Sequence, residues 1–137
     1  MRRTFLAALL PFALAACTTD RDPAPFQRTA ENQERLDQRL RGLSRSSGGS
    51  SCVPAFQARE QSIIDERTIL FFTGRSPVYR AEIRNCPALD RNSTIIRRST
   101  LPQICENEIF EVRDAGTQFS RGACTFDEIT RYDRSES

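Results

Sequence analysis

The sequence predicts a small, mainly β domain: a curled β-meander or barrel of about six or seven short strands, held by two disulfides. From residue 52 onward, apolar and polar residues alternate with a period of two, and turn-forming residues interrupt the pattern every few positions. A single half-buried sheet of this size has little core, so we expect the sheet to curl and cover its edges. The cysteines of this region are Cys52, Cys86, Cys105 and Cys124.

The first hairpin is expected at residues 62–64 and 68–73, on either side of Asp65-Glu66-Arg67. Its second strand is apolar almost throughout, which favours burial on both faces. After a turn at 74–77, residues 78–84 alternate between apolar and charged side chains, as expected for a strand with one buried face.

Further strands are expected at 94–97, 109–113, 117–120 and 124–129, with a turn or helical turn at 102–106. Asp114-Ala115-Gly116 is typical of a second hairpin turn. The expected core residues are Ile63, Ile69, Phe71, Tyr79, Ile83, Ile95, Phe110, Val112 and Phe126. The disulfide-bonded β domain is therefore placed at residues 52–134.

Residues 17–51 are predicted to form a tether that precedes the β domain. Residues 27–43 are rich in helix formers, and Leu36, Leu40 and Leu43 share one narrow face of a helix. Such a helix either docks on its own domain or stays exposed; a coiled-coil contact with a partner and a disordered segment are the alternatives. The serine and glycine residues at 44–51 indicate a flexible linker.

Four cysteines in a small exported domain indicate two disulfides, with free or redox-active thiols as an alternative, and the sequence allows three pairings. We favour Cys86–Cys105, which closes a short loop, together with Cys52–Cys124, which ties the start of the domain to its end. The chain has no CxxC pair and no histidine to complete a mixed zinc site, so no metal site is expected.

Residues 1–16 have the layout of a secretory signal peptide: Arg2 and Arg3, then a short apolar run. The following Leu14-Ala15-Ala16-Cys17 resembles the lipobox of bacterial lipoproteins. That resemblance implies cleavage before Cys17, lipidation of its sulfur and acylation of its amine, which would anchor the protein in a membrane. Thr18 stands where an aspartate would favour the inner membrane, so we expect a periplasm-facing protein of the outer membrane.

Composition excludes several function classes. Without Arg2 and Arg3 the chain has 18 arginines against 18 acidic residues, so the broad positive charge of a nucleic-acid binder is missing. The absence of histidine excludes Ser-His-Asp and Cys-His catalysis within this chain, and the absence of lysine removes lysine chemistry. We expect no enzyme activity and no cofactor.

Two groups of charged residues are candidate sites. Arg80 and Arg84 share a strand face, and Arg97 lies on a strand that could be adjacent, so the three arginines could hold an anion. Glu106 and Glu108 would have to serve as catalytic carboxylates if the protein were an enzyme. The whole acidic stretch of residues 106–114 is more typical of a solvated face than of a metal site.

Three segments carry a family resemblance: Cys86-Pro87-Ala88-Leu89, Leu101-Pro102-Gln103-Ile104-Cys105 and Glu108-Ile109-Phe110-Glu111-Val112. With Cys52 and Cys124 they resemble a bacterial family of small secreted or lipidated proteins of unknown function. Asn107-Glu108 departs from the Gly-Asp that is common there. The resemblance implies a disulfide-bonded β domain at the cell envelope and supplies no catalytic residue.

These observations predict a non-enzymatic lipoprotein of the cell envelope, acting as a protein-interaction or structural module with an envelope protein as partner. The alternatives are a domain that binds a small ligand, such as a lipid or a glycan, and an inhibitor of a periplasmic enzyme.

Overall fold

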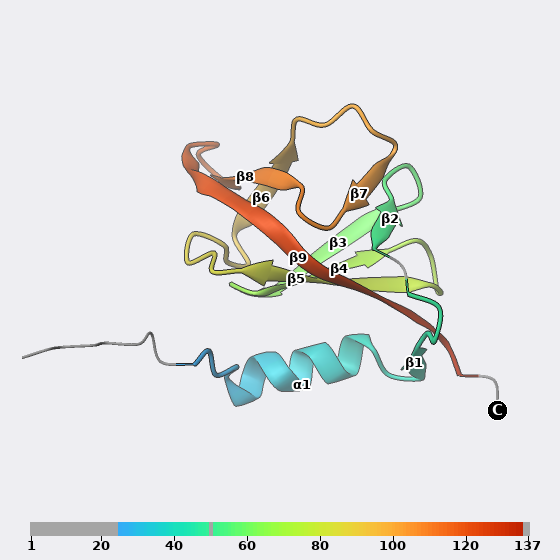
Figure 1. Cartoon of the computed structure of the whole chain (residues 1–137). Helices are drawn as coiled ribbons and strands as arrows, with labels where there is room; N and C mark the ends of the chain where they lie inside the picture. Colours follow the sequence, from blue (N-terminus) through green and yellow to red (C-terminus); the bar gives the residue numbers. More distant parts are fainter. Residues whose placement is uncertain (1–24, 50, 136–137) are drawn as a thin grey trace, which may run out of the picture.

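A strongly curled antiparallel sheet forms the body of the protein in the computed structural model, which describes residues 25–49 and 51–135 (Figure 1). The strand order is β3–β4–β5–β9–β8–β6, and β1 pairs with the end of β9. The strands of this sheet are β1 (Leu43–Arg45), β3 (Glu60–Asp65), β4 (Thr68–Phe72), β5 (Val78–Arg84), β6 (Ser93–Arg97), β8 (Ile109–Asp114) and β9 (Ser120–Arg134). The predicted mainly β, curled fold is confirmed: the sheet forms a half-barrel with β3 and β6 as its edges.

The hairpin expected around residues 65–67 is the β3–β4 pair, in which Ile63 lies opposite Ile69. Thr68 to Phe71 are buried, because β4 lies between β3 and β5 and is covered on both faces. The expected alternation of β5 is also confirmed from Tyr79 onward, where buried and more exposed residues alternate. Period-two patterning therefore predicts this half of the sheet well.

β9 is a single strand of 15 residues, where the sequence predicts two short strands at 117–120 and 124–129. Gly122 explains the difference: its φ of 137° is a conformation that side-chain-bearing residues rarely adopt. The pairing with β8 shifts register next to it, between Val112 and Arg113. The strand bends there and continues, so that β9 pairs with β8, β5 and β1 in turn.

The predicted turn at 102–106 is instead β7 (Gln103–Cys105), which pairs with β2 (Cys52–Pro54) in a separate two-stranded ribbon. Cys52 lies directly opposite Cys105 and forms a disulfide with it. Val53 and Ile104 from the ribbon are buried in the core of the sheet. The ribbon is thus a part of the core that local sequence patterns do not reveal.

Two disulfides are present, but the favoured pairing Cys86–Cys105 and Cys52–Cys124 is wrong. The bonds are Cys52–Cys105 and Cys86–Cys124. Arg84 of β5 pairs with Thr125 of β9, so the chain that leaves β5 passes beside Cys124. The prediction relied on loop length, whereas the pairing follows from which strands are neighbours.

The main core fills the concave face of the sheet. Seven of the nine expected core residues are buried in it, and Ile63 and Ile95, one on each edge strand, are partly buried against it. The ring centroid of Phe126 lies 4.4 Å from that of Phe110 and 6.1 Å from that of Phe71. Aromatic contacts across β4, β8 and β9 therefore hold the curled sheet together.

A second cluster joins helix α1 (Ala30–Arg39) to the other side of the sheet. Thr29 caps the N-terminus of the helix, and its hydroxyl accepts a hydrogen bond from the backbone N–H of Asn32 at 3.3 Å. Leu36 is 2% exposed and packs with Ile64, Leu70 and Val78. Of the three alternatives for this segment, the structure has the docked helix. No helix among the described residues is long and apolar enough to cross a bilayer.

The compact fold begins before Cys52. Leu43 to Arg45, where the sequence predicts the tether and the start of the linker, form β1 and pair with residues 132–134 of β9. The backbone N–H of Ser46 also donates to the carbonyl of Arg131 at 2.9 Å. The predicted boundary at residue 52 is therefore too late, because serine-rich composition does not prevent pairing with a long partner strand.

Candidate functional site

The three arginines proposed as an anion site do not meet. Arg80 and Arg84 lie on β5 and Arg97 lies on β6, with β9 and β8 between these strands. Arg80 pairs with Glu82, and Arg84 pairs with Asp127. Arg97 binds Glu108 at 2.8 Å and the carbonyl of Gln103 at 2.6 Å. Each guanidinium is thus engaged by a carboxylate of the same chain.

The pKa values reflect this pairing. Burial by itself lowers the pKa of Arg80. The interactions with Glu82 and Tyr132 together raise the pKa by more than burial lowers it, so the pKa of Arg80 is above its ordinary value. The hydrogen bond with Asp127 raises the pKa of Arg84. Both side chains remain charged, and their charge is largely neutralised locally.

Glu106 and Glu108 are bound to backbone groups. One carboxylate oxygen of Glu106 accepts the backbone N–H of Ile129 at 3.0 Å. Glu108 accepts the backbone N–H of Cys105 at 3.2 Å, in addition to Arg97. These carboxylates connect the chain before β8 to the neighbouring β9 and β7, and this accounts for their partial burial.

Glu111 and Asp114 also have partners. Hydrogen bonds from Arg113, Arg98 and Ser120 lower the pKa of Glu111 to about 2. Asp114 accepts backbone N–H groups from Thr117 and Gly116, which lowers its pKa and closes the turn between β8 and β9. No group of three or more potential metal ligands occurs within residues 25–49 and 51–135.

A groove of about 450 Å³ lies between the two edges of the half-barrel and is the candidate functional site. Gln61 lines it from β3, and Ile95 and Arg97 line it from β6. The partly buried Ala55, Ala58 and Ile95 contribute its apolar surface, and the buried side chains of Phe71 and Ile104 lie beneath them. Among the described residues, neither β3 nor β6 pairs with a second strand, so each presents one backbone edge beside an apolar surface.

We call this groove the edge groove. Arg59 supplies a positive charge that a ligand in the edge groove could reach. Its side chain is exposed and forms no ion pair within the part of the chain that the structure describes. Arg97, on the opposite edge, is neutralised by Glu108. The edge groove therefore combines an apolar surface, two unpaired strand edges and one uncompensated cation.

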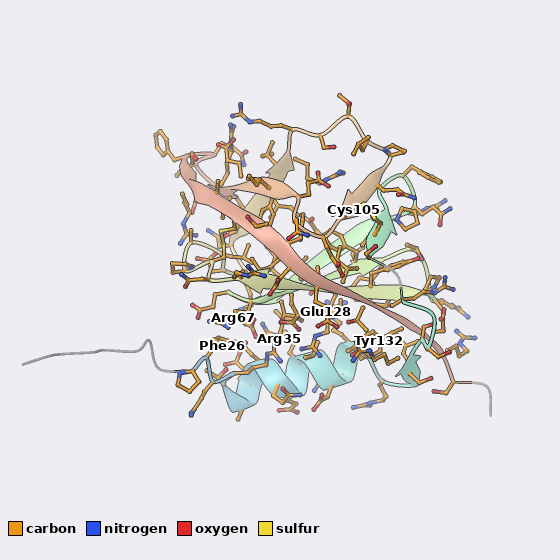
Figure 2. All side chains as sticks on the ribbon, viewed as in Figure 1. Phe26, Arg35, Arg67, Cys105, Glu128 and Tyr132 are labelled. Carbon is orange, nitrogen blue, oxygen red and sulfur yellow. A yellow bond between two sulfur atoms is a disulfide. The ribbon has the colours of Figure 1, made fainter. Side chains whose placement is uncertain are left out.

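A second set of contacts, separate from the edge groove, fixes the segment before α1 to the sheet. Arg28 binds Asp65 at 2.6 Å and the hydroxyl of Thr68, and both partners are buried. The ring centroid of Phe26 lies 4.7 Å from the guanidinium carbon of Arg67, and Figure 2 shows these two side chains close together where the segment meets the sheet. Residues 26–29 are thus fixed to the sheet just before α1 begins.

Sequence reasoning missed both Arg59 and the Arg28–Asp65 pair. Arg59 stands in an irregular segment without a motif, and its significance arises only because Ile95, 36 positions later, faces the same groove. Asp65 directly after Ile63-Ile64 is the one available signal, since a carboxylate at the end of a buried strand needs a partner. The sequence does not indicate that Arg28 is that partner.

A family model matches residues 1–137, the whole chain. The chain belongs to DUF6491, a family of unknown function. The expectation of an uncharacterised family is confirmed at this level. No curated protein matches this DUF6491 member, and no solved structure does.

In this DUF6491 protein, most of the segments that carry the resemblance have structural roles. Cys86 and Leu89 are buried in the core, and Phe110 and Val112 are buried on β8. Leu101, in contrast, is 64% exposed. These segments explain the fold, while the edge groove is formed largely by residues outside them.

Proposed function

We propose that this protein is a lipid-anchored, non-enzymatic module of the bacterial cell envelope that faces the periplasm and binds another protein. The anchor would be Cys17, at the end of the lipobox-like Leu14-Ala15-Ala16-Cys17. Residues 1–16 as signal peptide and Cys17 itself lie outside the described residues. The absence of aspartate at Thr18 supports the outer membrane over the inner membrane.

Because Phe26 and Arg28 are fixed to the sheet, only the chain between Cys17 and residue 25 can separate the domain from such an anchor. Residue 25 is eight positions after Cys17, and an extended chain spans at most about 29 Å over those eight steps. This is much shorter than the tether of residues 17–51 that composition predicts. A domain anchored in this way would stay close to the bilayer and meet partners near the membrane surface.

The observation that carries the proposed interaction is the edge groove, with its two unpaired strands beside an apolar surface. A partner segment in extended conformation could hydrogen-bond to β3 or β6 and pack apolar side chains on the partly buried Ala58 and Ile95. An acidic residue in that segment could form an ion pair with Arg59. Filling of the concave face by Phe71, Phe110 and Phe126 supports a surface interaction over a lipid or glycan held inside the sheet.

Site-specific photocrosslinking in living cells tests the interaction. A crosslinking amino acid replaces Gln61, which lines the edge groove, and in a matched strain it replaces Gln38, which is exposed on α1. We expect a discrete protein adduct from position 61 and none from position 38. The same adduct from both positions, or an adduct from position 38 alone, would refute the edge groove as the binding site.

Intact mass measurement tests the anchor separately. We expect the mature protein to begin at Cys17 and to carry acyl chains, and we expect Cys17→Ser to lose them. An unacylated chain in the wild type would refute the lipoprotein assignment and leave the crosslinking result unaffected.

A further inference from the structure

Three segments that are far apart in the sequence bring four arginines to one pocket, distinct from the edge groove. Arg39 ends α1 and Arg41 follows it, Arg75 lies in the turn between β4 and β5, and Arg134 ends β9. The pocket has a volume of about 600 Å³, and no carboxylate is among the described residues that line it. Figure 1 shows this end of the molecule, where α1 ends near β1 and the end of β9, away from the place where the chain enters α1.

Backbone hydrogen bonds hold these segments together. The backbone N–H of Arg134 donates to the hydroxyl of Ser76 at 3.1 Å, which joins the end of β9 to the β4–β5 turn. The backbone N–H of Ser135 donates to the carbonyl of Gly42 at 3.2 Å, which joins it to the residues after α1. The arginines therefore project from a fixed frame.

Among the described residues, the charge of this pocket is mostly uncompensated. Arg39 pairs with Glu60 at 3.4 Å, but both side chains are largely exposed. Arg41, Arg75 and Arg134 form no ion pair within the described part of the chain, whereas the three arginines of the predicted anion site are all paired. The negative end of the α1 dipole offsets roughly half a charge, which is less than these cations supply.

The floor of the pocket is apolar. Phe72 and Val78 line it, and the guanidinium carbon of Arg39 lies 5.6 Å from the centroid of the Phe72 ring. This contact directs one guanidinium over the floor. A ligand here would meet cations around its charged group and apolar surface beneath the rest.

We propose that this arginine pocket binds a phosphate group that carries more than one negative charge, as a phosphomonoester or a diphosphate. Guanidinium forks match the oxygen geometry of phosphate and donate paired hydrogen bonds. A phosphomonoester carries between one and two charges near neutral pH, in keeping with a pocket of several cations. The apolar floor fits the organic group attached to the phosphate.

The test is calorimetric titration of the purified full-length mature protein with pyrophosphate. We expect saturable binding, and we expect Arg75→Gln and Arg41→Gln each to weaken it about tenfold, because hydrogen bonds to charged groups contribute free energies of that order. Arg98→Gln is the control, since Arg98 is also exposed but lies beyond β6, away from this pocket. An equal loss in Arg98→Gln would mean a general charge effect and would overturn the site.

A second arm separates the sources of the phosphate. The same variants, each also carrying Cys17→Ser so that no acyl chain inserts into the bilayer, are mixed with vesicles of phosphatidylcholine, with and without phosphatidic acid, and sedimented. Arg75-dependent binding to phosphatidic acid vesicles would identify a lipid headgroup, and binding of pyrophosphate alone would identify a soluble phosphate compound. Failure of both probes to bind would overturn the proposal, whatever the result at the edge groove.

Discussion

Leu36→Ala tests whether α1 is an integral part of the fold. Leu36 is the buried residue of α1 and packs on Ile64, Leu70 and Val78. A ten-residue helix is only marginally stable in water by itself, so α1 depends on this contact. If the helix is part of the cooperative unit, the substitution lowers the stability of the whole domain.

The magnitude follows from the burial of this side chain. Leu36 is 2% exposed, and truncation to alanine removes three carbon atoms at roughly 0.8 kcal/mol each, with an additional cost for the cavity. We expect a loss of about 3 kcal/mol. That is a large share of the roughly 5–15 kcal/mol typical of a domain.

Urea unfolding followed by circular dichroism measures this loss, with Gln38→Ala as the control on the exposed face of the same helix. Hydrogen exchange shows where protection is lost. A change within about 0.5 kcal/mol of the control would refute the docking argument. Loss of protection in α1 alone, with unchanged unfolding of the sheet, would show that α1 is a separate unit.

Three further predictions concern stability. Replacing both Cys86 and Cys124 by alanine should cost about 4 kcal/mol in guanidinium unfolding, from the loop entropy of their 38-residue separation; a loss below about 1 kcal/mol would contradict this. Arg28→Gln leaves the buried carboxylate of Asp65 without its guanidinium and should cost about 2–4 kcal/mol, whereas Arg28→Met combined with Asp65→Leu should recover most of the loss. The pKa of Glu111 is lowered on folding, so its contribution is present above pH 4.5 and is lost as pH falls toward 2. Because the chain has no histidine, the melting temperature should be nearly constant from about pH 5.5 to 8.5 and fall below about pH 4.5; a transition near pH 6.5 would contradict this.

Local patterns predicted much of the fold. The alternation on β5 and the apolar run on β4 identified buried faces correctly, because both depend only on the geometry of a single strand. Local sequence patterns gave the wrong strand boundaries where a single residue departs from regular strand geometry. Gly122 reads as a turn residue, yet it allows β9 to bend and continue.

The candidate site was less predictable than the fold. Arg80, Arg84 and Arg97 were grouped because their strands could have been adjacent, but β9 and β8 lie between them. The edge groove and the arginine pocket are each assembled from several distant segments. Strand spacing along the chain does not reveal which strands become neighbours.

By itself, the sequence determined the fold class, most of the core and the presence of two disulfides, because these follow from side-chain periodicity and composition. Only the tertiary structure decided which cysteines pair, where α1 docks and which arginines, in the part of the chain that the structure describes, remain without carboxylates. These outcomes depend on strand order and register, which are set by the total free energy of packing and not by any short segment. The arginines without a carboxylate partner among the described residues are therefore a property of the folded chain alone.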